Sequence, residues 1–163
     1  MKKWILIVAV LTVSGCETLK PRTVSSAETG AASRLEFQSG PDSAAAAAKA
    51  AIAEQKWKLL YSGTERPKGD HGFQSNNHLG GETDDQLAWS KSAQAGLKPT
   101  AYLQAKTPTS AFSWGAELFV VVYATETGGS AIAISASTSQ ALEKEKLDSY
   151  IRQLGSAIDQ RLD

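Results

Sequence analysis

Apolar and polar positions alternate along several short stretches of the chain, which is the pattern of half-buried β-strands. One further stretch, residues 116–125, is β-branched and aromatic almost throughout, which predicts a central strand buried on both faces. Gly- and Pro-containing turns between the stretches favour antiparallel pairing. The alternating stretches are residues 34–39, 57–63, 71–77, 100–107 and 130–138.

Within residues 57–63 the alternation places Trp57, Leu59 and Tyr61 on one face of a strand. A turn with Pro and Gly follows, and residues 71–77 then give a weaker strand pattern. We therefore expect these two segments to form a hairpin.

Two segments carry helical patterns. Residues 44–57 are rich in alanine, which is the best helix former. Residues 140–163 repeat apolar side chains at spacings of three and four, which predicts one long amphipathic helix. On its wet face either Glu143 and Lys146, or Lys144 and Asp148, can pair. Residues 78–99 between the strands have no clear period and are expected to form a long loop.

This order of elements predicts an α+β domain with an antiparallel sheet of about five to six strands. The Ala-rich helix near the N-terminus and the C-terminal amphipathic helix are expected to pack on one face of that sheet. The order of elements is similar to that of helix-grip or TATA-binding-protein-like domains in small envelope lipoproteins, such as the BamC component of the outer-membrane assembly machinery. The similarity concerns element order alone, so no functional residue is transferred from it.

The first fifteen residues differ in character from the rest. Lys2 and Lys3 precede an apolar run over residues 4–13, and small residues then lead to the single cysteine, Cys16. A positive start, a short apolar run and small residues before a cleavage site make up a secretory signal peptide. The run is shorter than the roughly 20 residues that a membrane-spanning helix needs. We therefore expect residues 1–15 to be removed.

The tetrapeptide Val-Ser-Gly-Cys, residues 13–16, resembles the lipobox of bacterial lipoproteins. The resemblance implies cleavage before Cys16, attachment of lipid to its sulfur, and a location in the cell envelope. Glu17 stands where an Asp would favour retention at the inner membrane, so the resemblance implies the periplasmic face of the outer membrane. Residues 16–33 are small and polar and are predicted to form a flexible tether to a single domain over residues 34–163.

Charge and cysteine content narrow the functional classes. The chain has 17 Lys and Arg and 17 Asp and Glu. Removal of the signal peptide takes away Lys2 and Lys3, so the mature chain carries 17 − 2 = 15 basic against 17 acidic residues, a net charge of −2. We expect no nucleic-acid partner, because binding to phosphates needs a basic face that this composition does not offer. The single cysteine allows no internal disulfide.

Candidate chemistry is sparse. His71, His78 and Glu82 are ligand types that zinc accepts, but their spacing matches no rigid metal motif, so we favour a solvated polar loop and expect no metal or cofactor. No nucleophile motif is present, and the chain is not expected to be an enzyme.

Aromatic residues in predicted loops are candidate partner contacts, because such residues are enriched at interaction hot spots. The alternative is that they pack beneath their own loops, which we favour for Trp114 because it lies close to a strand. For Trp89 both alternatives stay open. The candidates are Trp89, Phe112 and Trp114.

These features together predict a lipid-anchored, non-catalytic binding or scaffold module for envelope partners, in contact with the membrane through lipid on Cys16. The alternative is a carrier or sensor of a small hydrophobic ligand held between the curled sheet and the C-terminal helix. Small residues on the predicted strands would leave room for such a ligand, or would let the helices pack closely. They are Ala101, Ala105, Ala131, Ala133 and Ala136. The sequence does not fix the oligomeric state.

Overall fold

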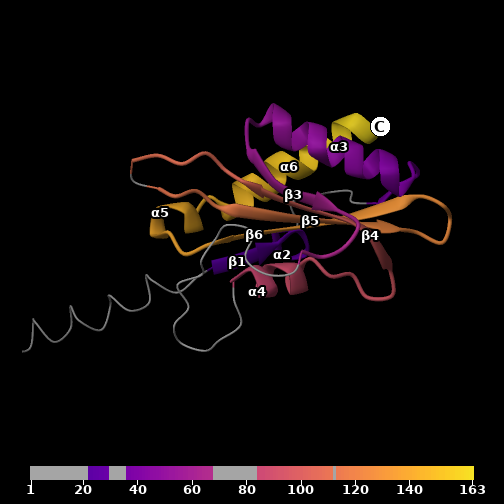
Figure 1. Cartoon of the computed structure of the whole chain (residues 1–163), viewed down its shortest axis with the longest axis horizontal. Coiled ribbons are helices and arrows are strands. Elements are labelled where there is room, and N and C mark those ends of the chain that lie inside the picture. The colour runs from indigo at the N-terminus through magenta and orange to yellow at the C-terminus, as the bar shows by residue number, and fades with distance from the viewer. Residues whose placement is uncertain (1–21, 30–35, 68–83, 112) are drawn as a thin grey trace, which may run out of the picture.

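The strands form one antiparallel sheet (Figure 1) in a computed structural model that describes residues 22–29, 36–67, 84–111 and 113–163. The spatial order is β1-β6-β5-β4-β3, and the short β2 pairs with the first residues of β6 on the same edge as β1. The α+β class, the antiparallel sheet and the C-terminal helix are confirmed. The strands are β1 (Arg22–Ser25), β2 (Glu36–Phe37), β3 (Lys58–Gly63), β4 (Lys98–Lys106), β5 (Glu117–Ala124) and β6 (Ser130–Thr138).

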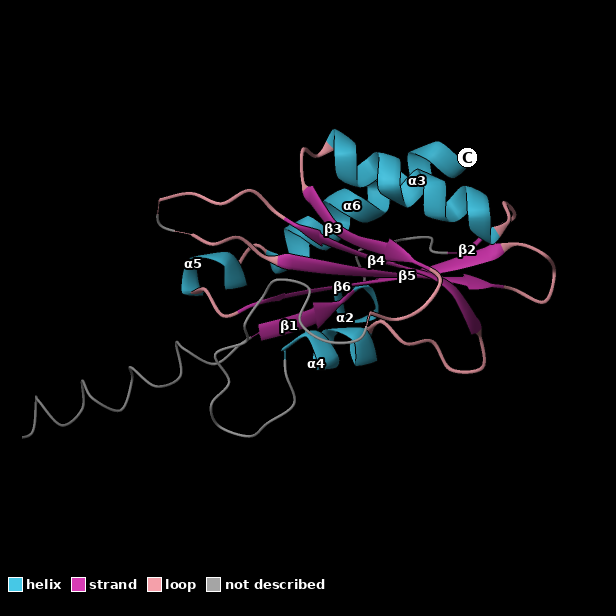
Figure 2. Ribbon diagram, in the orientation of Figure 1, coloured by secondary structure: helices cyan, strands magenta, loops and turns pink. Residues whose placement is uncertain are grey.

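Helices cover both faces of this sheet (Figure 2). Two of them, α3 and α6, lie on one face, whereas α4 lies on the other. The two helices that the sequence placed on one face correspond to α3 and α6, which share a face, whereas α4 on the opposite face was not predicted. The helices of the described residues are α2 (Ser26–Thr29), α3 (Pro41–Glu54), α4 (Asp84–Lys91), α5 (Ala141–Lys144) and α6 (Leu147–Leu162).

The main core lies between the sheet and the helices α3 and α6. β5 is the central strand, and the side chains Leu118, Val120 and Val122 point from it into this core. The helix α3 presents fully buried alanines, which let its backbone approach the sheet closely. α6 contributes larger side chains, which fill the remaining space. They are Leu147, Ile151, Leu154 and Ile158.

A second core lies between α4 and the sheet. The helix α4 falls within residues 78–99, the segment expected to be a long loop. Trp89 of α4 packs edge-on against Phe119 of β5, with ring centroids 4.9 Å apart. Behind the helix, Tyr123 donates a hydrogen bond to the carbonyl of Ser92 at 2.7 Å. The Ser135 hydroxyl of β6 donates to the carbonyl of Ala88 at 2.6 Å. Residues 84–91 of this segment thus form a helix docked on the sheet rather than part of a loop, and residues 78–83 lie outside the described residues.

The predicted tether also needs correction. Residues 22–25 form β1, which pairs with β6 in the register Arg22↔Thr138 to Ser25↔Ser135. Val24 joins the main core, and the hydroxyls of Thr23 and Ser137 lie 3.0 Å apart. The folded domain therefore begins at least twelve residues before the predicted boundary at residue 34.

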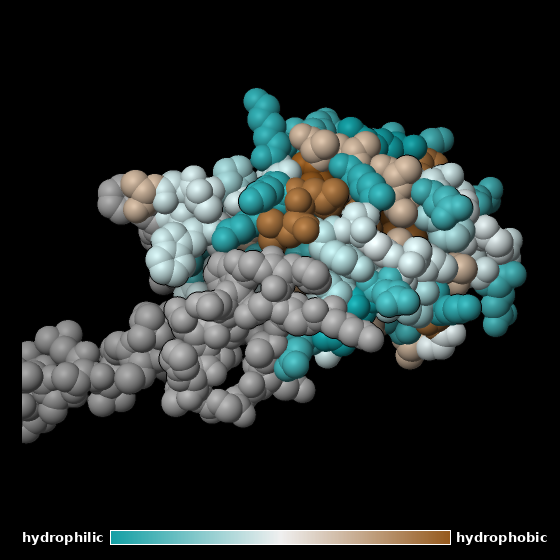
Figure 3. Space-filling model, viewed as in Figure 1, coloured by the Kyte–Doolittle hydropathy of each residue, from teal (hydrophilic) through white to brown (hydrophobic). Residues whose placement is uncertain are grey.

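The opposite edge of the sheet is β3, which pairs with β4 and has a register shift between Leu59 and Tyr61. Trp57 is buried, but Leu59 is 41% exposed. The predicted common face for Trp57, Leu59 and Tyr61 was therefore wrong: Trp57 lies before the first residue of β3, and the register shift separates Leu59 from Tyr61. Figure 3 shows hydrophobic side chains gathered over β3. The predicted hairpin partner, residues 71–77, lies outside the described residues.

Candidate functional site

The register of the sheet brings distant parts of the chain together at one end, here named the loop end. It comprises Arg22, the described residues of the β4–β5 loop (107–111 and 113–116) and residues 138–150. Arg22 begins β1 opposite Thr138, the last residue of β6. The Thr138 hydroxyl donates a hydrogen bond to the carbonyl of Gly115 at 3.3 Å. The start of the described domain and the β4–β5 loop therefore adjoin each other.

The β4–β5 loop is held by its own backbone. The amide of Thr107 donates to the carbonyl of Ala116 at 2.9 Å, and the amide of Ala116 donates to the Thr107 hydroxyl at 2.8 Å. Ser110 and Ser113 exchange backbone hydrogen bonds across the tip. Gly115 has φ +79°, and a Cβ there would lie 2.7 Å from the Thr107 carbonyl oxygen. The loop thus needs glycine at residue 115.

Glu143 is the polar centre beneath this loop. Glu143 is 3% exposed. Its carboxylate accepts a hydrogen bond from the Tyr150 hydroxyl at 2.6 Å and one from Lys146 Nζ at 3.1 Å. The Ser113 side chain donates a further hydrogen bond to it. The carboxylate therefore ties α5 to α6 and to the loop tip, and its oxygens are committed to these partners.

The environment shifts the pKa values of both hydrogen-bonded groups. Burial raises the pKa of the Glu143 carboxyl, but the hydrogen bonds from Tyr150, Ser113 and Lys146 and the Lys146 charge outweigh it, so its pKa lies below the usual 4.5. Burial, together with the hydrogen bond to Glu143, raises the pKa of Tyr150 from 10.0 to about 12. The anionic carboxylate and the neutral phenol are therefore the states that the fold favours.

Replacing Glu143 by Gln is expected to destabilise the domain by about 1.5–3 kcal/mol at pH 7, the usual range for hydrogen bonds to charged groups. Because its folded pKa is lowered, Glu143 stabilises the domain above pH 4.5, and this contribution is lost as pH falls through the folded value. Denaturant unfolding between pH 3 and pH 7 should give a shallower acid loss for Glu143→Gln than for the parent.

The stability that Tyr150 contributes depends on pH in the opposite direction. Because its folded pKa is raised, this contribution is present below pH 10 and is lost as pH rises to about 12.

The matched control for Glu143→Gln is Glu145→Gln, an exposed carboxylate two residues away, which should stay within about 0.5 kcal/mol of the parent. Equal acid profiles for the two variants would contradict the assigned role of Glu143.

The three candidate partner contacts have different outcomes. Trp114 is 61% exposed at the loop end, so the expectation that it packs beneath its loop was wrong. Trp89 is 5% exposed in the second core, and it is thus not a surface contact in this structure. Phe112 lies outside the described residues, as do Cys16, His71, His78 and Glu82.

Sequence reasoning missed the role of Glu143. It allowed the pairing with Lys146, which the structure has at 3.1 Å, but on the wet face of one long helix. The C-terminal segment is instead broken between α5 and α6, and this break turns Glu143 inward toward Tyr150. The sequence over residues 141–147 offers no Gly or Pro to indicate a break.

Within the described ranges, no group of three or more His, Cys, Asp or Glu side chains is placed to hold a metal ion. In the same part of the chain, no helix is both long and apolar enough to span a bilayer. Comparison of the chain with protein-family models, with curated proteins and with solved structures found no match.

Proposed function

We propose that the protein is a lipid-anchored component of a bacterial cell envelope, where its α+β domain acts as a non-catalytic binding or scaffold module. The observation that carries the proposal is Cys16 directly after a signal-like segment and a Val-Ser-Gly sequence. One or more acyl chains on this cysteine would hold the domain at the membrane, since each buried CH₂ contributes about 0.8 kcal/mol. Envelope partners would then be met at raised effective concentration.

Packing at the loop end supports a non-catalytic role. The buried carboxylate of Glu143 is engaged in holding the β4–β5 loop, and of the two candidates that the structure describes, Trp89 and Trp114, the latter is exposed. The alanines considered as a sign of a ligand cavity are parts of the two cores: Ala105 and Ala136 are fully buried in the main core. Among the residues that the structure describes, no specific observation thus favours a carrier of small hydrophobic ligands.

Replacing Cys16 by Ser is expected to leave the domain folded and to move the protein from the membrane fraction to the soluble fraction. The reason is that the apolar run over residues 4–13 is shorter than the roughly 20 residues needed to span a bilayer. Glu17→Gln, at the neighbouring position, is the matched control and should stay with the membranes. If the Cys16→Ser variant were still found in the membrane fraction, the anchoring proposal would be refuted.

The binding role needs a separate experiment. Crosslinking in the native envelope, followed by identification of the trapped species, should give a specific partner for the parent and none for a soluble Cys16→Ser chain. Failure to trap any partner, with the parent still bound to membranes, would contradict the binding role and leave the anchor intact.

A further inference from the structure

The connection between Cys16 and the folded domain is short. β1 begins at Arg22, six residues after Cys16. A fully extended chain spans at most about 3.6 Å per residue, so Arg22 lies within about 22 Å of a lipid-bearing Cys16. A nine-residue strand such as β4 is about 30 Å long, so the far end of the sheet lies beyond that reach. A lipid anchor would therefore hold the loop end nearest the bilayer.

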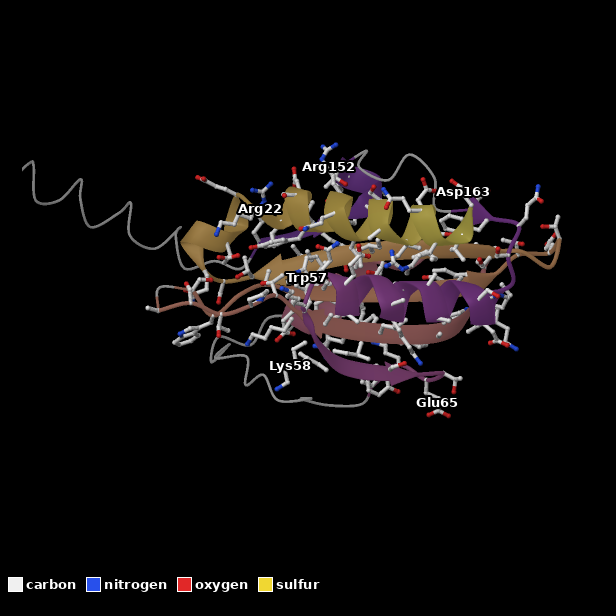
Figure 4. The ribbon with its side chains drawn as sticks, turned by 90° about the horizontal axis from the view of Figure 1, so that it is seen from above. Arg22, Trp57, Lys58, Glu65, Arg152 and Asp163 are labelled. Carbon is white, nitrogen blue, oxygen red and sulfur yellow. The ribbon has the colours of Figure 1, made fainter. Side chains whose placement is uncertain are left out.

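Trp114 lies at this same end. Thr138, the partner of Arg22 in the sheet register, donates its hydrogen bond to Gly115, the residue after Trp114. In Figure 4, Arg22 and Lys58 lie toward one end of the molecule and Glu65 lies toward the other. The exposed indole and the first residue of the domain thus share one end of the sheet.

The exposed indole of Trp114 lies on a loop that hydrogen bonds hold in place. The loop is closed by the Thr107–Ala116 hydrogen bonds and supported from below by Glu143 through Ser113. Little further ordering is needed when Trp114 makes a contact, which reduces the entropic cost of binding. Tryptophan has an apolar ring and one N–H donor, and it is enriched where membrane meets water for that reason.

Charge at the loop end suits an anionic surface. Two of the carboxylates in this part of the described chain, Glu117 and Glu143, are buried. The two that are not buried are Glu145 and Asp148. Counting all four carboxylates, the cations at the loop end and the adjoining strand ends exceed them by one, and two cations are paired: Arg22 with Asp148 at 3.8 Å and Lys146 with Glu143 at 3.1 Å. Each cation near an anionic bilayer contributes about 1 kcal/mol of attraction. The cations are Arg22, Lys58, Lys106, Lys144 and Lys146.

From the reach of the chain and the exposed indole, we infer that the loop end is a membrane-contact surface, with Trp114 seated among phospholipid headgroups. This inference rests on the proposed lipidation of Cys16. The partner at this end is a phospholipid surface containing anionic lipid. The domain therefore lies against the bilayer and does not move freely about its N-terminal connection. Its far end, with the β5–β6 turn, then faces away from the membrane.

The test uses the lipidated mature protein in vesicles of phosphatidylethanolamine and phosphatidylglycerol, with some lipid brominated on the acyl chain next to the headgroup. Trp57 and Trp89 are buried, so subtracting the emission of a Trp114→Phe variant isolates Trp114. The expected result is loss of Trp114 emission to brominated lipid and protection from aqueous acrylamide. The control is Thr127→Trp in the Trp114→Phe background, which places an exposed indole in the β5–β6 turn and should stay accessible to acrylamide.

Each outcome bears on one proposal. Absence of lipid on Cys16, seen by mass spectrometry before reconstitution, would overturn the anchoring proposal itself. Confirmed lipid with Trp114 as accessible as the control indole would overturn the membrane contact alone. Access in vesicles but protection in native membranes would assign Trp114 to a protein partner and also overturn it. Equal protection without phosphatidylglycerol would contradict the electrostatic part.

Discussion

Trp89→Ala is expected to destabilise the domain by about 3–5 kcal/mol, which is the usual cost of truncating a buried Trp or Phe to Ala. The side chain is 5% exposed and makes edge-on ring contacts with Phe119 at 4.9 Å and Tyr102 at 5.5 Å. Without the indole, α4 loses its main apolar contact with the sheet, and the Phe119 ring is exposed. Denaturant unfolding of purified variants measures the loss as a lower transition midpoint.

Trp114→Ala is the matched control, because it makes the same chemical change at a side chain that is 61% exposed. Its free energy of unfolding should stay within about 0.5 kcal/mol of the parent. If the two variants lost equal stability, the docking of α4 on the second face of the sheet would be wrong.

Removal of residues 22–29 is expected to cost about 4 kcal/mol or more. Burial of Val24 contributes roughly 1.5–2 kcal/mol, and each backbone hydrogen bond of the β1–β6 ladder contributes about 1 kcal/mol. The deletion also takes away Glu28, which pairs with Lys91 of α4 at 3.0 Å. It therefore weakens both faces of the sheet.

Two mature chains with Cys16→Ser provide the comparison: one lacks residues 17–21 and the other lacks residues 17–29. The first removes only residues before β1 and should unfold at the midpoint of the uncut chain. The second should be much less stable. Equal midpoints for the two chains would support the original expectation of a tether that reaches residue 33.

Strong local patterns predicted the centre of the fold well. Residues 116–125 have no alternation and many β-branched side chains, and β5 is indeed buried on both faces as the central strand. Apolar spacing over residues 140–163 likewise predicted the C-terminal helix. Such segments need no information from distant parts of the chain, because their own pattern already specifies burial.

β1 could not be found in this way. Its residues, Arg-Thr-Val-Ser, carry one large apolar side chain, and the buried Thr23 hydroxyl finds its partner, Ser137, more than a hundred residues away. Tertiary pairing therefore overrides the local pattern. α4 is eight residues long, but its acidic first turn and Lys91 in the last turn are helix-end features that could have indicated it.

The loop end shows the same limit. Trp114 could be named as a candidate from the sequence, but its exposure depends on the turn at Gly115 and on the hydrogen bonds of Thr107. Its position at the same end of the sheet as Arg22 depends on the strand order, which no short stretch reveals. Motif analysis predicted the anchor at Cys16, whereas only the fold relates that anchor to a particular end of the domain.

Lipidation of Cys16 underlies both proposals, and the mass of the N-terminal peptide from membrane-extracted protein tests it most directly. The predicted peptide begins at Cys16 and carries a diacylglyceryl group on sulfur, with or without an acyl group on the new amino terminus. A peptide that begins at Met1, or one that contains an unmodified Cys16, would contradict the lipid anchor and the membrane-facing loop end together.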